Sequence, residues 1–369
     1  MSKLEQLLQD LCPDGVKFFK LGDITSILRG KRLTKSQLVE KGDYPVYHGG
    51  LEPLGYYNEN NREKDTVMII NVGASAGIVG YSTVDFWSSD GCFCVKKSEN
   101  IDSRYLYYTL SCKESYMKSR VRKAGIPTLD AADIEKIIIP LPPVEIQKEI
   151  VTILDDFENY NKTLNEELEL REKQSNFYIA ELLSFDNSTP KKKLDDCCIL
   201  EKGKTPIQKA VAGEYPLVVT TEERKSSNTY QFNSKTVCIP LVSSRGHGVA
   251  CLNRVYYQEG KFALGNILCG VTPNNYDELS AEYLYYYLNF KKDILLVPLM
   301  KGGANVSLTV DALRGVKVPV PTIEVQNDIV SKLKPFAEYQ DYLRKEIEAR
   351  QKQYEYYRDQ LLSFKQFSE

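Results

Sequence analysis

The chain contains one segment twice, and this repeat limits its possible fold more than any other feature. Ile139-Pro-Leu-Pro-Pro-Val-Glu-Ile-Gln-Lys-Glu-Ile-Val recurs 179 residues later as Val318-Pro-Val-Pro-Thr-Ile-Glu-Val-Gln-Asn-Asp-Ile-Val. The same offset relates Leu182-Leu-Ser-Phe to Leu361-Leu-Ser-Phe. An offset that stays constant from residue 139 to residue 185 indicates a tandem duplication, so the fold consists of two copies of one unit.

The segments before each of these repeats also correspond, but less closely. Arg29-Gly-Lys matches Lys202-Gly-Lys, and Tyr105-Leu-Tyr-Tyr matches Tyr283-Leu-Tyr-Tyr. The offset drifts between these anchors, so insertions and deletions separate them. Close similarity in one part and drift in another predict a shared scaffold that carries two different surfaces.

The closely repeated parts have the pattern of long helices. Each follows a Pro-x-Pro connector, and apolar residues then recur at spacings of three and four, which favours pairing with another helix. The sequence therefore predicts an α+β fold with domains at 1–142 and 187–321, joined by spacer helices at 143–186 and 322–369. The two helices are expected to form an antiparallel coiled coil with pseudo-twofold symmetry. The predicted pairing residues are Ile146, Ile150, Ile153, Phe157, Leu164, Leu182, Val325, Ile329, Phe336, Leu343, Ile347 and Leu361.

Two features leave the geometry of these helices open. Pro335 interrupts the second helix, so a kink or a displaced start is expected there. Each helix could also fold back on its own domain instead of pairing with the other helix.

Within the domains, residues 66–72 and 235–242 have the composition of buried strands. The glycines of Gly73-Ala-Ser-Ala-Gly-Ile-Val-Gly lie in a strand–turn context that predicts a hairpin. The tyrosines at 105–108 and 283–287 are expected to pack in the core or against the helices rather than to stack on bases.

The sequence shows few groups for catalysis or metal binding. Gly203-Lys204-Thr205 resembles the end of a phosphate-binding loop, but Cys198 stands where that motif needs its first glycine. The chain has two histidines, His48 and His247, which we interpret as loop residues, and no Cys-x-x-Cys pair. The nine cysteines are expected to be reduced. We therefore predict a binding protein with no metal and no bound cofactor, and, because there is no signal peptide or spanning segment, a cytoplasmic one.

The charge distribution permits contact with nucleic acid. The net charge is −2, but residues 143–186 hold 11 acidic and 4 basic side chains, whereas residues 187–321 hold 12 acidic and 17 basic ones. The acidic excess lies in the first predicted helix, which leaves the domains neutral to basic.

With the repeat established, the chain resembles the specificity subunits of type I restriction–modification systems. Several elements carry the resemblance in the same order in both copies. They are the early glycine loop, the segment Tyr44-Pro-Val-Tyr-His-Gly-Gly, the glycine loops Ala124-Gly-Ile-Pro-Thr-Leu and Gly303-Ala-Asn-Val-Ser-Leu, and the Pro-Leu-Pro-Pro helix entry at 140–143. The second entry, Pro-Val-Pro-Thr, departs slightly from this pattern.

The resemblance implies two target-recognition domains, each reading half of a split site in double-stranded DNA. The paired helices would act as a ruler and bind two modification subunits, which supply S-adenosylmethionine and methylate adenine. Restriction subunits driven by ATP would join them, and no membrane partner is implied.

The residues that contact DNA are not given by the resemblance, but their chemistry suggests candidates. Base edges and phosphates are bound by Arg, Lys and Asn, and by N–H groups of glycine-rich loops. The candidates are Arg29, Lys31, Arg32, Arg120, Arg122, Lys123, Lys202, Lys204, Arg245, Lys301 and Asn305. Each of them could instead be an ordinary solvated surface residue.

Three other functions remain open at this point. The chain could be the recognition subunit of a methylating nuclease outside type I, which neighbouring genes would reveal. It could be a coiled-coil scaffold without a DNA role, or an enzyme that acts alone.

Overall fold

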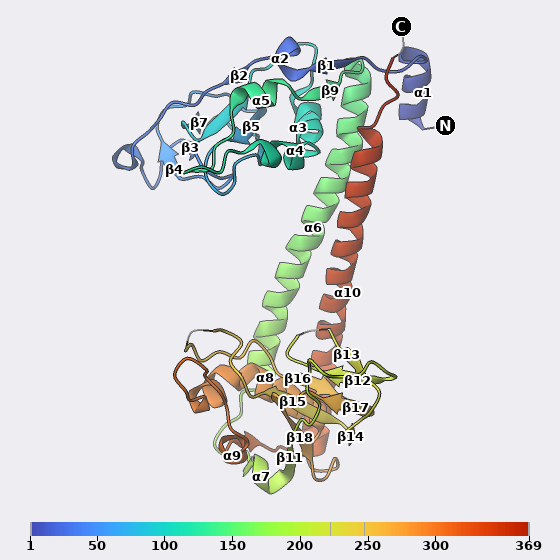
Figure 1. The fold of residues 1–369 in the computed structure, drawn as a ribbon. Helices are drawn as coiled ribbons and strands as arrows, with labels where there is room; N and C mark the ends of the chain where they lie inside the picture. The colour runs from blue at the N-terminus through green and yellow to red at the C-terminus, as the bar shows by residue number, and fades with distance from the viewer. Residues whose placement is uncertain (1, 222, 247, 368–369) are drawn as a thin grey trace. The chain divides into compact units, whose positions relative to one another are not determined.

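The computed structural model of the protein describes residues 2–221, 223–246 and 248–367. These residues form two compact units, Met1–Asn165 with Glu346–Glu369, and Glu166–Lys345. Each unit contains one globular domain and a segment of both long helices, α6 (Val144–Leu182) and α10 (Ile323–Leu361) (Figure 1). The compact units thus divide both helices between them.

The first domain is built on a four-stranded antiparallel sheet in the order β2-β8-β5-β6. A second sheet, β4-β3-β7, contains one parallel pair, and β1 pairs with β9 at the connector to α6. Its strands are β1 (Phe18–Lys20), β2 (Ile27–Leu28), β3 (Tyr44–Tyr47), β4 (Gly55–Tyr57), β5 (Thr66–Ile70), β6 (Val79–Ser82), β7 (Trp87–Ser88), β8 (Cys92–Val95) and β9 (Ile138–Pro140). Its helices are α1 (Lys3–Leu11), α2 (Leu21–Ile24), α3 (Ser103–Ser111), α4 (Glu114–Arg120) and α5 (Ala131–Glu135).

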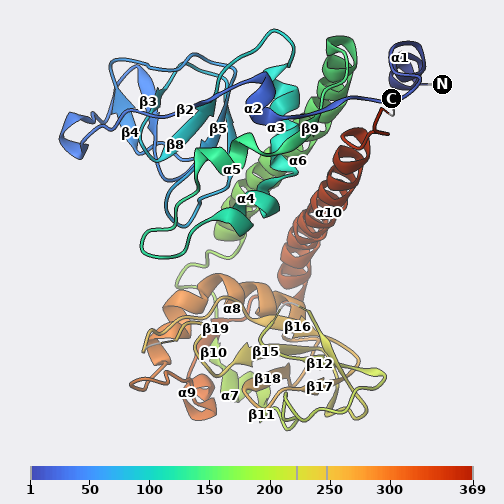
Figure 2. The same cartoon turned by 45° about the horizontal axis from the view of Figure 1, so that its top comes forward.

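The second domain repeats this plan. Its antiparallel sheet has the order β11-β18-β15-β16, its second sheet β13-β12-β17-β14 has one parallel pair, and β10 pairs with β19. Helix α8 (Ala281–Leu295) packs against β15 and β16 (Figure 2). The remaining elements are α7 (Leu194–Cys197), α9 (Val310–Arg314), β10 (Lys191–Lys193), β11 (Cys198–Lys202), β12 (Tyr215–Val218), β13 (Lys225–Ser227), β14 (Phe232–Asn233), β15 (Thr236–Pro240), β16 (Tyr256–Gln258), β17 (Lys261–Leu264), β18 (Leu268–Pro273) and β19 (Lys317–Pro319).

Two local predictions are confirmed in these domains. Strands β5 and β6 are neighbours in an antiparallel pair, and the Gly77 N–H donates to Ile70 O at 2.7 Å, so the glycine-rich segment is a hairpin turn. Tyr105 and Tyr283 are fully buried in the two main cores, as predicted for the tyrosine segments.

A buried glutamine joins α6 to the first domain. Gln147 has no exposed surface, and its Oε1 accepts the N–H of Asp102, the N-cap residue of α3, at 2.8 Å. Its Nε2 donates to the carbonyls of Asn100 (3.1 Å) and Pro142 (2.8 Å). Tyr105 Oη also donates to Pro140 O, so the Tyr-Leu-Tyr-Tyr and Pro-Leu-Pro-Pro segments bind each other.

The second copy contains the same joint. Gln326 is fully buried, accepts the N–H of Ser280, the N-cap residue of α8, at 2.8 Å, and donates to Glu278 O and Pro321 O. Tyr283 Oη donates to Pro319 O at 3.1 Å. Because these residues are related by the sequence repeat, the duplicated motif encodes the attachment of a helix to its domain.

The first turns of each helix belong to the domain that precedes it. Ile146 and Ile150 are fully buried in the core of the first domain, and Ile329 is buried in the core of the second. Their apolar spacing therefore serves the domain core first, and the prediction that they are helix-pairing residues needs this correction. Val325 is 44% exposed, so its assignment to the helix seam is wrong: it faces outward one turn before Ile329.

The ends of the helices pack into the other domain's core. Leu182, at the end of α6, packs against the core that contains Ile329, and Leu361, at the end of α10, packs against the core that contains Ile146. Each core thus collects three parts of the chain: a domain, the start of one helix and the end of the other.

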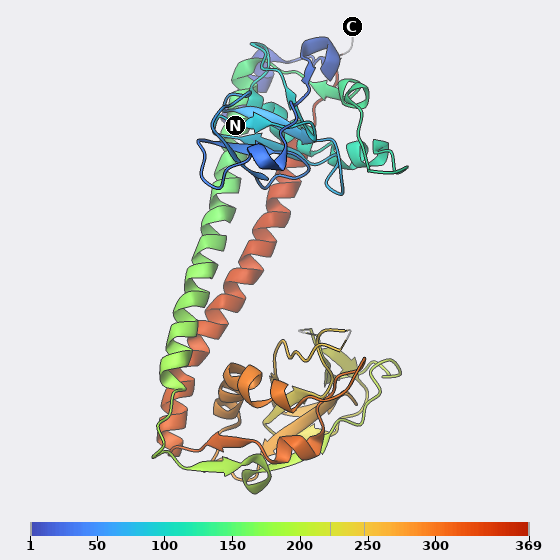
Figure 3. The same ribbon diagram turned by 90° about the vertical axis from the view of Figure 1, so that its left-hand side faces the viewer.

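Between these ends, the helix segments contact each other directly within each unit (Figure 3). Phe157 stacks on Tyr357 at 5.5 Å between ring centroids, and the equivalent residues Phe336 and Tyr178 stack at 5.4 Å in the other unit. Residue numbers rise along one helix as they fall along the other, so the segments are antiparallel. Leu164 and Leu343 are buried, while Ile153 and Ile347 are half-buried.

Cation–π contacts between the helices repeat in the same way. Arg350 lies over the Tyr160 ring at 5.6 Å, and the equivalent Arg171 lies over Tyr339 at 5.4 Å. One set of contacts thus recurs in both units with the roles of the two helices exchanged.

Pro335 does not displace the start of the second helix. Helix α10 begins at Ile323 and is helical on both sides of Pro335. Of the two outcomes expected from the sequence, a kink or a displaced start, the displaced start is therefore excluded.

The chain's last described segment pairs with its first domain. Val16 N–H donates to Lys365 O, and Phe367 N–H donates to Val16 O, both at 2.9 Å. Gly15 has a φ of 112°, and a Cβ there would lie 2.6 Å from Lys365 O, so glycine permits this close approach.

We predict that Gln147→Leu lowers the free energy of unfolding by about 2 kcal/mol, because it leaves the buried carbonyl of Pro142 and the part-buried N–H of Asp102 and carbonyl of Asn100 without their partner. Urea unfolding of the full chain measures this loss. The exposed Gln174 on the same helix is the matched control, and Gln174→Leu should change stability by less than about 0.5 kcal/mol. Equal effects of the two substitutions would contradict a structural role for the buried amide.

Candidate nucleic-acid interface

The first glycine loop of domain 1, residues 29–32, has a fixed backbone and outward cations. A Cβ on Gly30 would lie 1.9 Å from Ser89 O, so only glycine lets the loop reach this turn. Lys31 N–H donates to Ser88 O at 2.9 Å, and Trp87 Nε1 donates to Lys31 O at 2.7 Å. The candidates Arg29, Lys31 and Arg32 are all exposed.

Domain 2 holds the equivalent loop, residues 202–204, in the same manner. A Cβ on Gly203 would lie 2.1 Å from Gly265 O, and the Gly203 N–H donates to Leu268 O. Lys202 and Lys204 are exposed. Lys204 Nζ lies 2.7 Å from Glu201 Oε1, and this hydrogen bond lowers the pKa of Glu201 below its usual value.

A second glycine loop in domain 1 is a hairpin closed by Arg122 and Thr128, which exchange backbone hydrogen bonds of 2.9 and 3.1 Å. Gly125 supplies the left-handed residue at its tip, with a φ of 80°. The Arg122 side chain is 66% exposed and pairs with Asp130 at 3.1 Å. Lys123 is exposed, and Arg120 lies over the Tyr116 ring.

In domain 2, Lys301 and Ser307 close the same hairpin with mutual hydrogen bonds of 2.8 and 2.9 Å. Lys301 and Asn305 are exposed. The neighbouring loop carries Arg245, also exposed, and its Gly248 N–H donates to Ala304 O of the hairpin. The structure therefore brings three candidates from two distant segments together. His247, in the same loop, lies outside the described residues.

The two glycine loops of each domain are linked through the backbone. In domain 1, Leu129 N–H donates to Asn71 O, and Asn71 N–H donates to Gly91 O in the turn that carries Ser88 and Ser89. In domain 2 the corresponding bonds run from the Leu308 N–H to Leu241 O and from the Leu241 N–H to Ile267 O. In addition, the Gly203 N–H donates to Leu268 O next to Ile267. Each domain therefore presents one connected set of turns with cations at both ends.

Sequence reasoning missed two polar groups at the junction in domain 1. Asn71 is 7% exposed, and within the described part of the chain its Oδ1 has no hydrogen-bond partner. His48 Nδ1 accepts the Gly91 N–H at 3.1 Å, with Asp90 Oδ1 3.2 Å away, so the predicted loop histidine orders this turn. The second copy has Leu241 and Val219 at these places, so the repeat offered no signal for them.

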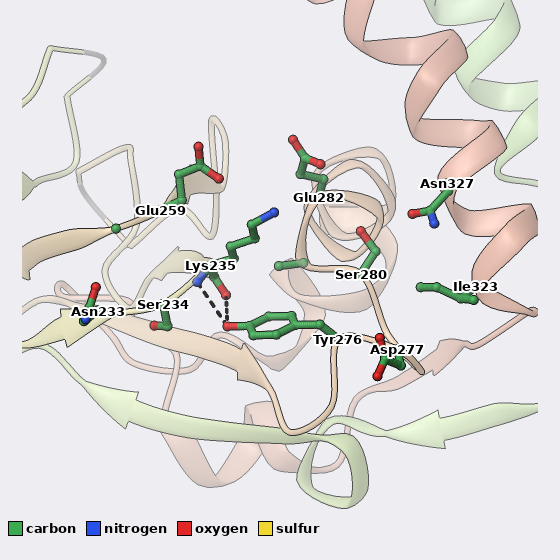
Figure 4. A pocket seen from close by; sticks show the side chains of 12 residues that line it. Asn233, Ser234, Lys235, Glu259, Tyr276, Asp277, Ser280, Glu282, Ile323 and Asn327 are labelled. Carbon is green, nitrogen blue, oxygen red and sulfur yellow. Dashed lines mark hydrogen bonds between the residues drawn. The ribbon is translucent and has the colours of Figure 1, made fainter.

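A surface pocket lies elsewhere, in the second unit. It has a volume of about 860 Å³, and Tyr276 Oη both accepts from and donates to the backbone of Lys235 on one side of it (Figure 4). Glu259, Asp277 and Glu282 also line it, but none of the candidate residues does. The candidate surface is therefore made of exposed turns that offer cations and N–H groups, which suits phosphates and base edges.

Two other features are absent from the described residues. No helix among them is long and apolar enough to cross a membrane. No three of their His, Cys, Asp and Glu side chains gather closely enough to hold a metal ion.

Comparison with known proteins gives a consistent result. A family model, the type I restriction modification DNA specificity domain, matches residues 13–170 and 187–351. A putative type I specificity subunit of Mycoplasma pneumoniae is 27% identical over 372 residues, covering 95% of this chain and 98% of the relative. The EcoR124I/EcoR124II specificity subunit of Escherichia coli is 29% identical over 412 residues, covering 99% of this chain and 97% of the relative.

The fold also matches a solved structure. The S subunit of a type I restriction–modification system from M. genitalium superposes with a TM-score of 0.68 at 18% identity, covering 94% of this chain and 95% of that one.

Proposed function

Because this chain belongs to the family of type I restriction–modification specificity subunits, we propose that each of its domains binds one half of a bipartite double-stranded DNA site. The observation that carries this proposal is the pair of linked glycine loops in each domain. The backbone hydrogen bonds that close the hairpin and link it to the neighbouring turn are equivalent in the two domains, but the outward side chains differ. A shared backbone can hold the same position on phosphates while different side chains read different bases.

The proposed division of labour leaves the chemistry to other subunits. Modification subunits would bind S-adenosylmethionine and methylate adenine, restriction subunits would use ATP, and this chain would bind DNA without a cofactor and without catalysis of its own. The family name and the names of the relatives, which are specificity subunits of restriction enzymes, support this division. A DNA-binding role also favours the cytoplasm as the location of the protein.

Two equivalent surfaces on the helices support two modification subunits as partners. Phe177 on α6 and Tyr356 on α10 are related by the repeat offset of 179 residues. They are 65% and 61% exposed, and each is a T-shaped neighbour of a tyrosine that stacks between the helices. Large exposed aromatics are common anchors of protein interfaces, and two equivalent anchors fit two copies of one partner.

Exchange of residues 1–142 for the same domain of a relative with another specificity should change one half of the methylated motif and leave the other half intact. The two halves are expected to be independent because each domain has its own loops and core. Single-molecule sequencing of methylated adenines measures the motif, and deletion of the chain should abolish it. A folded chimera that changes both halves, or a motif that survives the deletion, would sink the proposal.

Alanine at Arg122 and Lys123 tests the hairpin of domain 1. If both side chains bind phosphate, affinity should fall on all DNA, and the salt dependence should become shallower by about one for each phosphate that is no longer neutralised. If Arg122 reads a guanine edge, its removal should cost about 1–3 kcal/mol on the cognate site and relax one motif position. Binding of the assembled methyltransferase to DNA at several salt concentrations separates these results.

Two controls accompany this test. Lys301→Ala should affect only the second half-site, and Lys136→Ala, which removes an exposed cation after α5, should affect neither. Unchanged affinity, salt dependence and motif in the hairpin variants would show that this loop does not face DNA.

Phe177→Ala and Tyr356→Ala should each weaken the binding of one modification subunit by at least about tenfold, because interface anchors of this kind contribute more than about 1.4 kcal/mol. Native mass spectrometry of the reconstituted complex, over a range of concentrations, counts the bound subunits. Ile294→Ala is the matched control, because Ile294 is 69% exposed on α8 of the second domain. Two full-strength binding sites in the double variant would rule out these anchors.

A further inference from the structure

Both domains carry the same cluster of three tyrosines against their long helix, which we call the tyrosine cage. In domain 1 it consists of Tyr81, Tyr107 and Tyr108, with neighbouring ring centroids 5.7 and 5.2 Å apart. In domain 2 the equivalent rings of Tyr257, Tyr285 and Tyr286 are 6.2 and 5.1 Å apart. Each cage joins a strand of the main sheet to the tyrosine helix, α3 or α8.

The cage in domain 1 holds an arginine. The Arg104 guanidinium lies 4.9 Å from all three ring centroids, and its side chain is 23% exposed. It donates to Asp155 at 2.7 Å and to Glu158, both on α6, and Tyr108 Oη donates to Asp155 as well. Arg104 thus ties α3 to α6 through two carboxylates and three aromatic faces, which the planar guanidinium suits better than any other side chain.

At the same place in domain 2 the charges are reversed. Glu282 stands at the position of Arg104, and it pairs with Lys334 of α10 at 3.4 Å. Lys334 is the repeat equivalent of Asp155, and Ala337 is the equivalent of Glu158. The joint between domain and helix is therefore formed from equivalent positions in the two copies, but its charges are reversed.

We infer that Arg104 and Glu282 are positioning residues that match each recognition domain to its own place in the chain. If domain 2 stood before α6, at the position of domain 1, Glu282 would face Asp155 and Glu158, and three carboxylates would meet against aromatic rings. If domain 1 stood before α10, at the position of domain 2, Arg104 would face Lys334. Each arrangement places like charges within a few ångströms in partly desolvated surroundings, where their repulsion is strongest.

The two domain positions should differ in how strongly they disfavour the wrong domain. The first joint is more buried and makes two ion pairs with the same arginine, whereas the Lys334 side chain is 53% exposed. Exposed ion pairs contribute little, and water screens their repulsion as well. Charge should therefore disfavour the wrong domain more strongly at the position before α6 than at the position before α10.

A double-mutant cycle in the full chain tests this inference. Arg104→Glu alone should lower the thermal unfolding midpoint by about 5 °C or more. In a chain with Asp155→Lys and Glu158→Ala, which reproduces the α10 side of the second joint, the same substitution should lower the midpoint by less than half as much, or raise it. Arg104→Met removes the charge but keeps an unbranched apolar stem. It should lower the midpoint in the wild-type chain, where it breaks two ion pairs, and lower it less, or raise it, in the chain with Asp155→Lys and Glu158→Ala, where it removes a like-charge contact.

The result that overturns the inference is an Arg104→Glu penalty of equal size in the two backgrounds, since packing alone would then explain it. If Arg104→Glu yields no folded protein, the cycle is run at the more exposed joint with Glu282→Arg and Lys334→Asp, where the like-charged single variants should be less stable than the double variant. The unfolding midpoint reports on the joint whether or not the domains bind DNA. A failure of this inference can therefore be told apart from a failure of the proposed function.

A rearranged chain gives a second readout. Domain 2, residues 187–321, is placed at both positions, either unchanged or with Glu282→Arg in the copy placed first. The unchanged version should be cleaved by a protease at the first connector at least about tenfold faster than the substituted version. Equal cleavage of the two versions would show that charge does not assign the domains to their places.

Discussion

The buried amides of Gln147 and Gln326 hold the architecture together. Each one accepts the N–H of an N-cap residue and donates to two carbonyls, so a single side chain fixes the start of a long helix against a tyrosine helix. Both the oxygen and the nitrogen of each amide are hydrogen-bonded, which offsets the cost of burying them. The direction in which each spacer helix leaves its domain follows from this contact.

The sequence predicted the large features because the repeat and the helical spacing encode them. It misplaced the ends of the helix seam: Ile146 and Ile150 have the spacing of pairing residues, but the domain core buries them first. Apolar periodicity tells which face is buried and not what buries it. The glycine loops could be found because Gly30 and Gly203 recur, whereas Asn71 could not, since its role depends on a turn contributed by a distant segment. Which candidates touch DNA stays a prediction.

The two copies keep some contacts and vary others in a regular way. Contacts that set geometry, such as the stacked pairs Phe157–Tyr357 and Phe336–Tyr178, are the same in both. The groups that would distinguish the copies from each other differ. The cations of the glycine loops differ in type, and Arg104 and Glu282, which pair with the long helices at equivalent positions, differ in the sign of their charge. Duplication thus supplies the contacts that set the shared geometry. The two copies differ mainly in the side chains that would distinguish one half of the protein from the other.

The pairing of Val16 with Lys365 and Phe367 has a consequence for the order of the chain. In the second copy, the corresponding strand entry at Thr189 follows the end of α6 through continuous peptide bonds, whereas in the first copy hydrogen bonds between the two ends of the protein take their place. The end of α10 is therefore held beside the first domain by noncovalent contacts, a role that peptide bonds fill for the end of α6 and the second domain.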